Sequence, residues 1–241
     1  MDEPVTTRVR LRYTKLGKVR FTSHRDAARL WERALRKTGL PVASTQGFTP
    51  RPKISFGLAL PTGGESLAEY LDVELTDAVD VEALPAQLAA ALPDGFDVVA
   101  ARTLVGRTVS LQDDVTSVTW ELFAPWLTAE HHAQAAERLL AASTLPIDRV
   151  RKGVRARDDV RPAVIDLRSA GDRLVADLAT VGRALRPAEL AELAYPHCDP
   201  SSEPFVAVRA LRTHQWIEHD TVRREVISLP TVVPALTQVS A

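Results

Sequence analysis

The sequence is poor in sulfur, with one cysteine, Cys198, and one methionine among 241 residues. A single cysteine excludes an internal disulfide, and it excludes an iron–sulfur cluster held by several cysteines of this chain. No apolar run approaches the roughly 18 residues that a membrane-spanning helix needs. The amino terminus also lacks a basic segment followed by an apolar one. We therefore expect a cytoplasmic protein with no contact to a membrane, no metal site and no cofactor of its own.

Charge is distributed unevenly, although the net charge is only -1. Residues 8–53 are strongly basic, with Asp26 and Glu32 as their acidic members. Residues 54–101 contain no Lys or Arg and many Asp and Glu. A second basic run comprises Arg149, Arg151, Lys152, Arg155, Arg157 and Arg161. The first fifth of the chain is thus the strongest candidate for binding an anionic partner.

A basic amphipathic helix is predicted after Ser23. The Ser23 hydroxyl and Asp26 have the spacing of a capping box, so the helix should begin at His24 and stop at Gly39. Its apolar stripe consists of Ala27, Leu30, Trp31, Ala34 and Leu35. Its basic face consists of Arg25, Arg29, Arg33, Arg36 and Lys37.

The order of elements predicts an α+β fold of two ferredoxin-like β-α-β-β-α-β units, each with an antiparallel sheet. The first unit, residues 1–105, has these predicted elements: strand 8–13, helix 24–37, a candidate strand 40–43, strands 54–60 and 70–75, helix 81–92 and strand 96–101. The second, residues 106–217, repeats that order: strand 118–123, helix 128–142, strands 145–150, 164–167 and 174–178, helix 186–193 and strand 205–211. Residues 218–241 show little periodicity, so we expect a mobile tail or one docked on a partner.

This topology separates two groups of arginines. The first and third strands should be neighbours, which places Arg8, Arg10 and Arg12 beside Asp72 and Glu74. Cross-strand ion pairs would then consume the strand arginines. No comparable acidic element is predicted over the helix, so its arginines remain available for phosphate contacts. A solubilising helix face is the alternative interpretation.

Two further features have both a functional and a structural interpretation. Phe48, in a loop stiffened by prolines and followed by Arg51 and Lys53, could stack a base beside its phosphate, or it could fill the core. His24, at a helix amino terminus, could serve as a neutral general base on an RNA hydroxyl. The simpler interpretation, which we favour, is that His24 is only the first helical residue. His131–His132 and His197-Cys198-Asp199 lack the ligands of a closed metal site.

One family resemblance covers the chain strongly from Tyr13 to Leu75 and loosely beyond. The residues that carry it are Tyr13, Lys15, Gly17, Arg20-Phe21, Ser23-His24, Asp26, Arg33-Ala34-Leu35, Gly39-Leu40-Pro41, Ser44, Gln46-Gly47-Phe48, Pro50, Pro52-Lys53, Ser55-Phe56-Gly57, Ala59-Leu60-Pro61 and Glu69-Tyr70-Leu71-Asp72. They resemble the bacterial radical-SAM-linked domain of unknown function, in its stand-alone form. The resemblance implies a radical SAM protein as partner.

These observations lead to one functional expectation and two alternatives. We expect a non-catalytic RNA-binding or substrate-presenting accessory protein that works with a radical SAM enzyme in RNA maturation or modification. The alternatives are a metal-independent endoribonuclease that uses His24, and a protein-interaction adaptor. The candidate RNA-binding residues are Arg25, Arg29, Arg33, Arg36, Phe48, Arg51 and Lys53.

Overall fold

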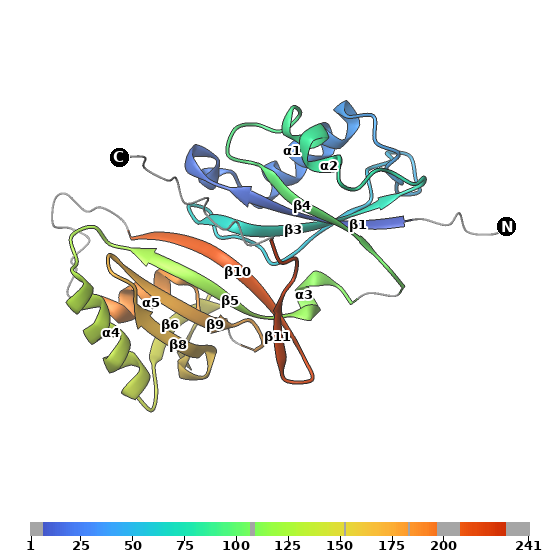
Figure 1. Cartoon of the computed structure of the whole chain (residues 1–241). Helices are drawn as coiled ribbons and strands as arrows, with labels where there is room; N and C mark the ends of the chain where they lie inside the picture. The colour runs from blue at the N-terminus through green and yellow to red at the C-terminus, as the bar shows by residue number, and fades with distance from the viewer. Residues whose placement is uncertain (1–6, 107–108, 152, 183, 197–207, 230–241) are drawn as a thin grey trace, which may run out of the picture.

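The computed structural model describes residues 7–106, 109–151, 153–182, 184–196 and 208–229. It is a mixed α/β structure with a large, mostly antiparallel sheet and several helices (Figure 1). The strands are β1 (Thr7–Lys15), β2 (Ile54–Phe56), β3 (Glu65–Leu75), β4 (Val98–Leu104), β5 (Val115–Phe123), β6 (Pro146–Arg151), β7 (Val154–Asp159), β8 (Val164–Ser169), β9 (Arg173–Ala179), β10 (Arg209–His219) and β11 (Val222–Glu225). The helices are α1 (His24–Lys37), α2 (Leu84–Ala89), α3 (Leu111–Asp114), α4 (Ala129–Ala141) and α5 (Pro187–Ala194), with 3-10 turns η1 (Gly17–Phe21) and η2 (Arg161–Ala163).

Nine of the described strands form one continuous sheet, where the sequence predicted two. Its order is β4-β1-β3-β10-β5-β9-β8, with β2 also on β3 and β11 also on β10. The two parts join where β10 pairs in parallel with β3, at Leu211 opposite Glu65 and Arg212 opposite Ser66. Because β2 is only three residues long, it covers β3 from Leu71 to Val73 and leaves the first residues of β3 free to pair with β10.

The first core lies between α1, α2 and the strands β1, β3 and β4 (Figure 1). Trp31 of α1 is completely buried there, with its ring 4.8 Å from that of Tyr13. This confirms the prediction that Trp31 is a core residue. Helix α1 also begins and ends where the sequence predicted. Its first turn is capped by Ser23, whose Oγ accepts a hydrogen bond from the amide of Asp26 at 3.2 Å.

The second core lies under α4 and α5 against β5, β8 and β9. It extends into the first part of the chain through Leu60, Ala68 and Tyr70. The predicted division into domains at residue 105 therefore stays a prediction, since both the sheet and this core continue across it. The strand predicted at 40–43 is reduced to a single bridge between Val42 and Leu75. Strand β7, which forms a separate hairpin with β6, was not predicted.

The segment after residue 217 corrects another prediction. Strand β10 continues to His219, β11 returns along it, and the next two residues, Val226 and Ile227, are buried. The expectation of a mobile or partner-docked tail is therefore wrong for residues 218–229. Residues 230–241 lie outside the described part, as do residues 197–207, which include Cys198 and the start of the predicted last strand. In the part of the chain that the structure describes, no helix has the length and apolar character to cross a membrane.

Candidate nucleic-acid interface

The arginines of β1 form the ion pairs that the sequence predicted for all three, and two of them have the predicted partners. Arg10 is buried and makes a two-pronged contact with Asp72, with Nε–Oδ1 at 2.7 Å and Nη2–Oδ2 at 3.0 Å. Arg8 lies 3.6 Å from Glu74 near the surface. The register explains both contacts, because Arg10 is opposite Asp72 and Arg8 is opposite Glu74 in the β1–β3 ladder.

Arg12 departs from the prediction. Its partner on β3 is Tyr70, which offers no carboxylate, and the buried guanidinium instead turns to β11. Arg12 Nη1 lies 2.6 Å from Glu225 Oε1 and donates a hydrogen bond of 2.7 Å to the carbonyl of Ile227. Arg10 and Arg12 are therefore engaged within the protein and unavailable to a ligand, while Arg8 is paired with Glu74 near the surface.

The arginines of α1 have the opposite environment. All four are exposed and lie on the face of the helix opposite its buried residues; we call them the cationic helix face: Arg25, Arg29, Arg33 and Arg36. Arg29 lies 3.3 Å from Asp26, and Arg36 lies 3.6 Å from Glu32, in solvent-exposed pairs of little strength. Arg25 and Arg33 make no hydrogen bond or ion pair with any described residue. The cationic helix face therefore keeps most of its charge for an external partner.

Residues 42–53 form a second exposed feature, which we call the arm. Its two sides are joined by a bridge between Ser44 and Pro52 and by a hydrogen bond of 2.9 Å from the Thr45 amide to the Arg51 carbonyl. Phe48 lies far from the joined base and its relative exposure is 110 %. The interpretation of Phe48 as a core residue is therefore wrong. A fully exposed aromatic ring on a projecting arm suits contact with a partner.

The two basic residues of the arm differ in how free they are. Arg51 is exposed, and its side chain contacts no acidic group among the described residues. Lys53, in contrast, places Nζ 3.1 Å from Glu74, the carboxylate that also faces Arg8. Of the two, Arg51 is the better candidate for a phosphate contact.

His24 is exposed on the first turn of α1, and its ring meets that of Phe56 edge-on at 5.2 Å between centroids. No described residue forms a hydrogen bond with the ring, so nothing in the described structure fixes its tautomer or pairs it with a second acid or base. The described residues also contain no group of three side chains suited to a metal ion. The surroundings of His24 thus fit the simpler interpretation of a first helical residue better than a catalytic base.

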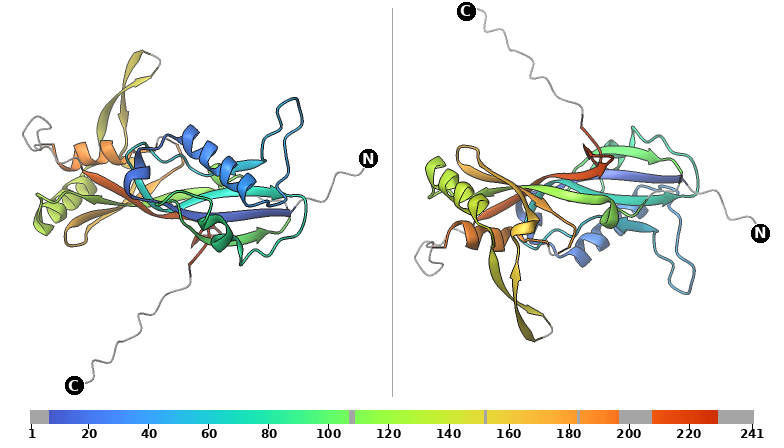
Figure 2. Two further views of the ribbon diagram at one scale, coloured as in Figure 1. Left: turned by 90° about the horizontal axis from the view of Figure 1, so that it is seen from above. Right: turned by 90° about the horizontal axis from the view of Figure 1, so that it is seen from below.

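A second exposed basic element is the β6–β7 hairpin. The sequence showed its basic residues but did not predict the hairpin. The run from Arg149 to Arg157 lies in the β6–β7 hairpin, of which Lys152 lies outside the described residues, and Arg161 begins η2. Arg149 and Arg161 are held by internal acceptors, whereas Arg155 and Arg157 are exposed. Figure 2 shows the arm and the hairpin projecting from the same side of the molecule, with α1 between them in the view from above. The basic composition signalled this element, but its position beside α1 depends on the tertiary fold.

Comparison with known proteins gives a family match. The family described as "Uncharacterized protein conserved in bacteria (DUF2344)" matches residues 8–188. The matched range contains the cationic helix face, the arm and the β6–β7 hairpin, and it ends before β10. No curated protein matches the chain.

Proposed function

We propose that this protein, which belongs to the bacterial family DUF2344, is a non-catalytic accessory protein that binds RNA or presents it to an enzyme. The enzyme in this proposal is a radical SAM protein, and the process is RNA maturation or modification. The cationic helix face grips the RNA backbone, and the arm contacts an unpaired base.

The observation that carries the proposal is the contrast in charge between β1 and α1. Arg10 and Arg12 are neutralised inside the protein, while the arginines of the cationic helix face point to solvent with weak partners at most. From Arg25 to Arg36 the helix rises about 16 Å, which is long enough to meet several phosphates of one strand. Guanidinium groups form two-pronged hydrogen bonds with phosphates, which suits this role.

The arm adds a different kind of contact. Phe48 is fully exposed, although an aromatic side chain ordinarily gains free energy by burial. A base stacked on the ring would bury it without any demand on base identity. Arg51, which is exposed in the same arm, would bind the adjoining phosphate. The arm and the cationic helix face together offer the two contacts that single-stranded nucleic acid needs.

The radical SAM partner rests on sequence. The resemblance of residues 13–75 points to a domain linked to such enzymes. With Cys198 as its one cysteine, this chain cannot supply the three thiolates of a radical SAM cluster. The chemistry must then reside in another protein, and this chain acts on the substrate by holding it.

The proposal includes a fold assignment of two ferredoxin-like units. The strand order β4-β1-β3-β2 in the first part and β10-β5-β9-β8 in the second supports it, because both orders are antiparallel and follow the same pattern along the chain. In this assignment the β6–β7 hairpin is an insertion between α4 and the second strand of the unit.

Direct binding measurements test the proposal. The purified full chain is titrated into fluorescently labelled single-stranded RNA, and anisotropy is followed for the wild type and the double variant Arg29→Glu/Arg33→Glu. We expect the variant to lose at least about tenfold in affinity, since each reversal removes a phosphate contact and adds repulsion. The matched control, Arg155→Glu/Arg157→Glu, changes the net charge equally at the β6–β7 hairpin and should lose far less.

Three other results would redirect the assignment. Equal losses in both double variants would show that only net charge matters and would contradict a specific surface on α1. RNA cleavage that disappears in His24→Ala would favour an endoribonuclease. RNA binding absent from the wild type would favour a protein-interaction adaptor. Crosslinking in cells, with the Arg29→Glu/Arg33→Glu variant as background, would then identify the RNA bound by the wild type.

A further inference from the structure

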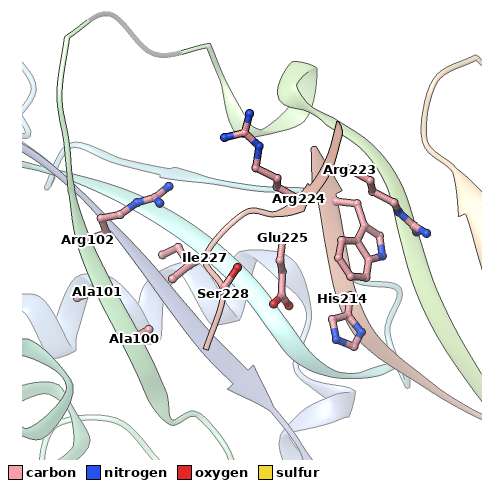
Figure 3. Close-up of a pocket in the computed structure, with 10 residues that line it drawn as sticks. Ala100, Ala101, Arg102, His214, Arg223, Arg224, Glu225, Ile227 and Ser228 are labelled. Carbon is pink, nitrogen blue, oxygen red and sulfur yellow. The ribbon is translucent and has the colours of Figure 1, made fainter. Parts of the chain in front are cut away.

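A pocket of about 630 Å³ lies on the opposite side of β1 from α1. It is lined by β4, β10, β11 and the residues that follow β11 (Figure 3). The β1 register fixes the side: Val9 and Leu11 face the core under α1, whereas Arg10 and Arg12 are opposite Arg102 and Ala100 of β4. The pocket is therefore separate from the cationic helix face. No sequence pattern indicated it, because its walls come from residues 100–102 and 214–228.

The charges around the pocket do not cancel. Two of the arginines near the pocket are paired with carboxylates. Arg12 pairs with Glu225, and Arg223 places Nη1 3.2 Å from Asp177 Oδ2. Two other guanidinium groups have no carboxylate partner among the described residues. Arg102 on β4 donates a hydrogen bond of 3.1 Å to the carbonyl of Val226, and the Arg224 side chain on β11 makes no hydrogen bond or ion pair with a described residue. Two uncompensated positive charges at one cavity favour a ligand that carries more than one negative charge.

A rigid aromatic wall borders the same cavity. His214 and Trp216 of β10 stack at 4.9 Å with 10° between their planes. Trp216 is held from behind, because its Nε1 donates a hydrogen bond of 2.8 Å to Thr119 Oγ1 and the Arg223 guanidinium lies 4.3 Å from its ring. Figure 3 shows His214 beside Glu225 at the base of the pocket. Burial lowers the pKa of His214, so the imidazole is an uncharged planar surface near neutral pH.

We propose that this pocket binds a nucleotide, with its phosphate held by Arg102 and Arg224 and its base against the His214–Trp216 stack. The two arginines line the cavity from different elements, β4 and β11, and Figure 3 shows both guanidinium groups at the end of the pocket away from His214. A phosphate between them would join the first part of the sheet to the segment after β10. The same chemistry has two sources, a free mononucleotide or the phosphorylated end of an RNA. The site does not depend on RNA binding by the cationic helix face.

Titration calorimetry of the full chain tests the site with adenosine 5′-monophosphate, and with adenosine as the probe that lacks the phosphate. We expect the monophosphate to bind, adenosine to bind far more weakly, and Arg224→Gln to lose about tenfold in affinity for the monophosphate. Arg102→Gln should lose a similar factor. Arg224 is the cleaner probe, because Arg102 also supports the Val226 carbonyl. Arg155→Gln on the distant hairpin is the matched control and should bind as the wild type does.

A second arm of the experiment distinguishes the two sources. A short RNA with a 5′-phosphate and the same RNA without it are titrated into the Arg29→Glu/Arg33→Glu variant, so that backbone binding by α1 does not contribute. Binding that needs both the 5′-phosphate and Arg224, without binding of the monophosphate, would identify an RNA end as the ligand. The proposal is overturned if neither phosphorylated probe binds, or if Arg224→Gln binds both as tightly as the wild type.

Discussion

Strand β1 and helix α1 lie against each other, and both carry a row of arginines. The two rows differ in burial and in how strongly they are paired with carboxylates. On β1, Arg10 and Arg12 are almost fully buried and each touches a carboxylate at 2.7 Å or less. On α1, Arg29 and Arg33 are exposed, and the single carboxylate near Arg29 is itself in solvent. A basic segment is therefore not the same as a basic surface. Only the row on the side away from the sheet can act on a partner.

The reason lies in the periodicity of each element. A strand repeats every two residues, so Arg8, Arg10 and Arg12 share one face and meet the matching positions of the next strand. A helix presents every third or fourth residue outward, and no strand or helix of the described residues covers that side of α1. Arginines on the strand therefore stabilise the fold, and arginines on the helix are free to bind.

The largest expected effect comes from removing a buried arginine. Arg12→Met deprives Glu225 and the Ile227 carbonyl of their donor in a nearly buried site, which should cost about 3–5 kcal/mol in the free energy of unfolding. Arg8→Met is the control, since Arg8 and Glu74 are partly exposed and 3.6 Å apart, and it should cost less than about 1 kcal/mol. Urea denaturation measures both. Similarly small losses of unfolding free energy in the two variants would show that burial does not distinguish Arg12 from Arg8.

The comparison extends to aromatic residues, through buried Trp31 and exposed Phe48. Phe48→Ala should leave the free energy of unfolding within about 0.5 kcal/mol of the wild type, but weaken binding of single-stranded RNA by about 1–3 kcal/mol through loss of a stacked base. Phe48→Tyr should restore binding. The matched control is Ile165→Ala, which truncates an exposed apolar side chain on β8. Unchanged RNA affinity in Phe48→Ala would exclude the arm from the interface.

The salt dependence of RNA binding gives a finer measure of the same contrast. Removing one arginine that binds a phosphate should reduce the slope of log K against log salt by about 0.7 for a single strand. Arg33→Gln should therefore flatten the slope by that amount, while Arg8→Gln should leave it unchanged. Anisotropy titrations across a series of salt concentrations provide the slopes. A slope that responds to Arg8 as strongly as to Arg33 would contradict the assignment of the interface to α1.

The smallest expected effect concerns two histidines that differ in exposure, because His132 is buried and His24 is exposed. Burial lowers the pKa of His132 despite the opposing charge of Asp172, and its Nδ1 lies 2.6 Å from the Tyr195 hydroxyl. Because the unfolded chain then takes up a proton first, stability should be complete above about pH 6.5 and fall as the pH drops below that value. Each unit by which folding lowers the pKa of His132 contributes at most about 1.4 kcal/mol to the free energy of unfolding.

Denaturation at several pH values in this window measures the effect, above the range near pH 4 where carboxylates in an unfolded chain titrate. His132→Gln should flatten the decline. His24→Gln, at the exposed start of α1, should leave the decline as it is. A decline that is equally steep in His132→Gln would mean that other groups cause it.

The sequence predicted what depends on neighbouring residues. The cap at Ser23, the buried stripe of α1 with Trp31, and the pairs of Arg8 and Arg10 all follow from local periodicity and from one strand order. It failed for Arg12, because the acceptor at Ile227 lies 215 residues away and belongs to a segment with no periodic signal. For the same reason the pairing of β10 with β3, and the pocket beside β11, were absent from the prediction. Which distant segment pairs with an open strand edge depends on how well the different segments of the chain compete for that edge, and local sequence patterns do not report this.

The position of β10 has a consequence for how the protein is made. This strand is among the last described residues to leave the ribosome, yet it lies in the middle of the sheet, between β3 and β5. Until it emerges, the facing edges of β3 and β5 carry unpaired backbone groups that can pair with another nascent chain. A message truncated after α5 would therefore yield two partly built sheets with open edges. A strand that is translated after both parts of the sheet thus joins them.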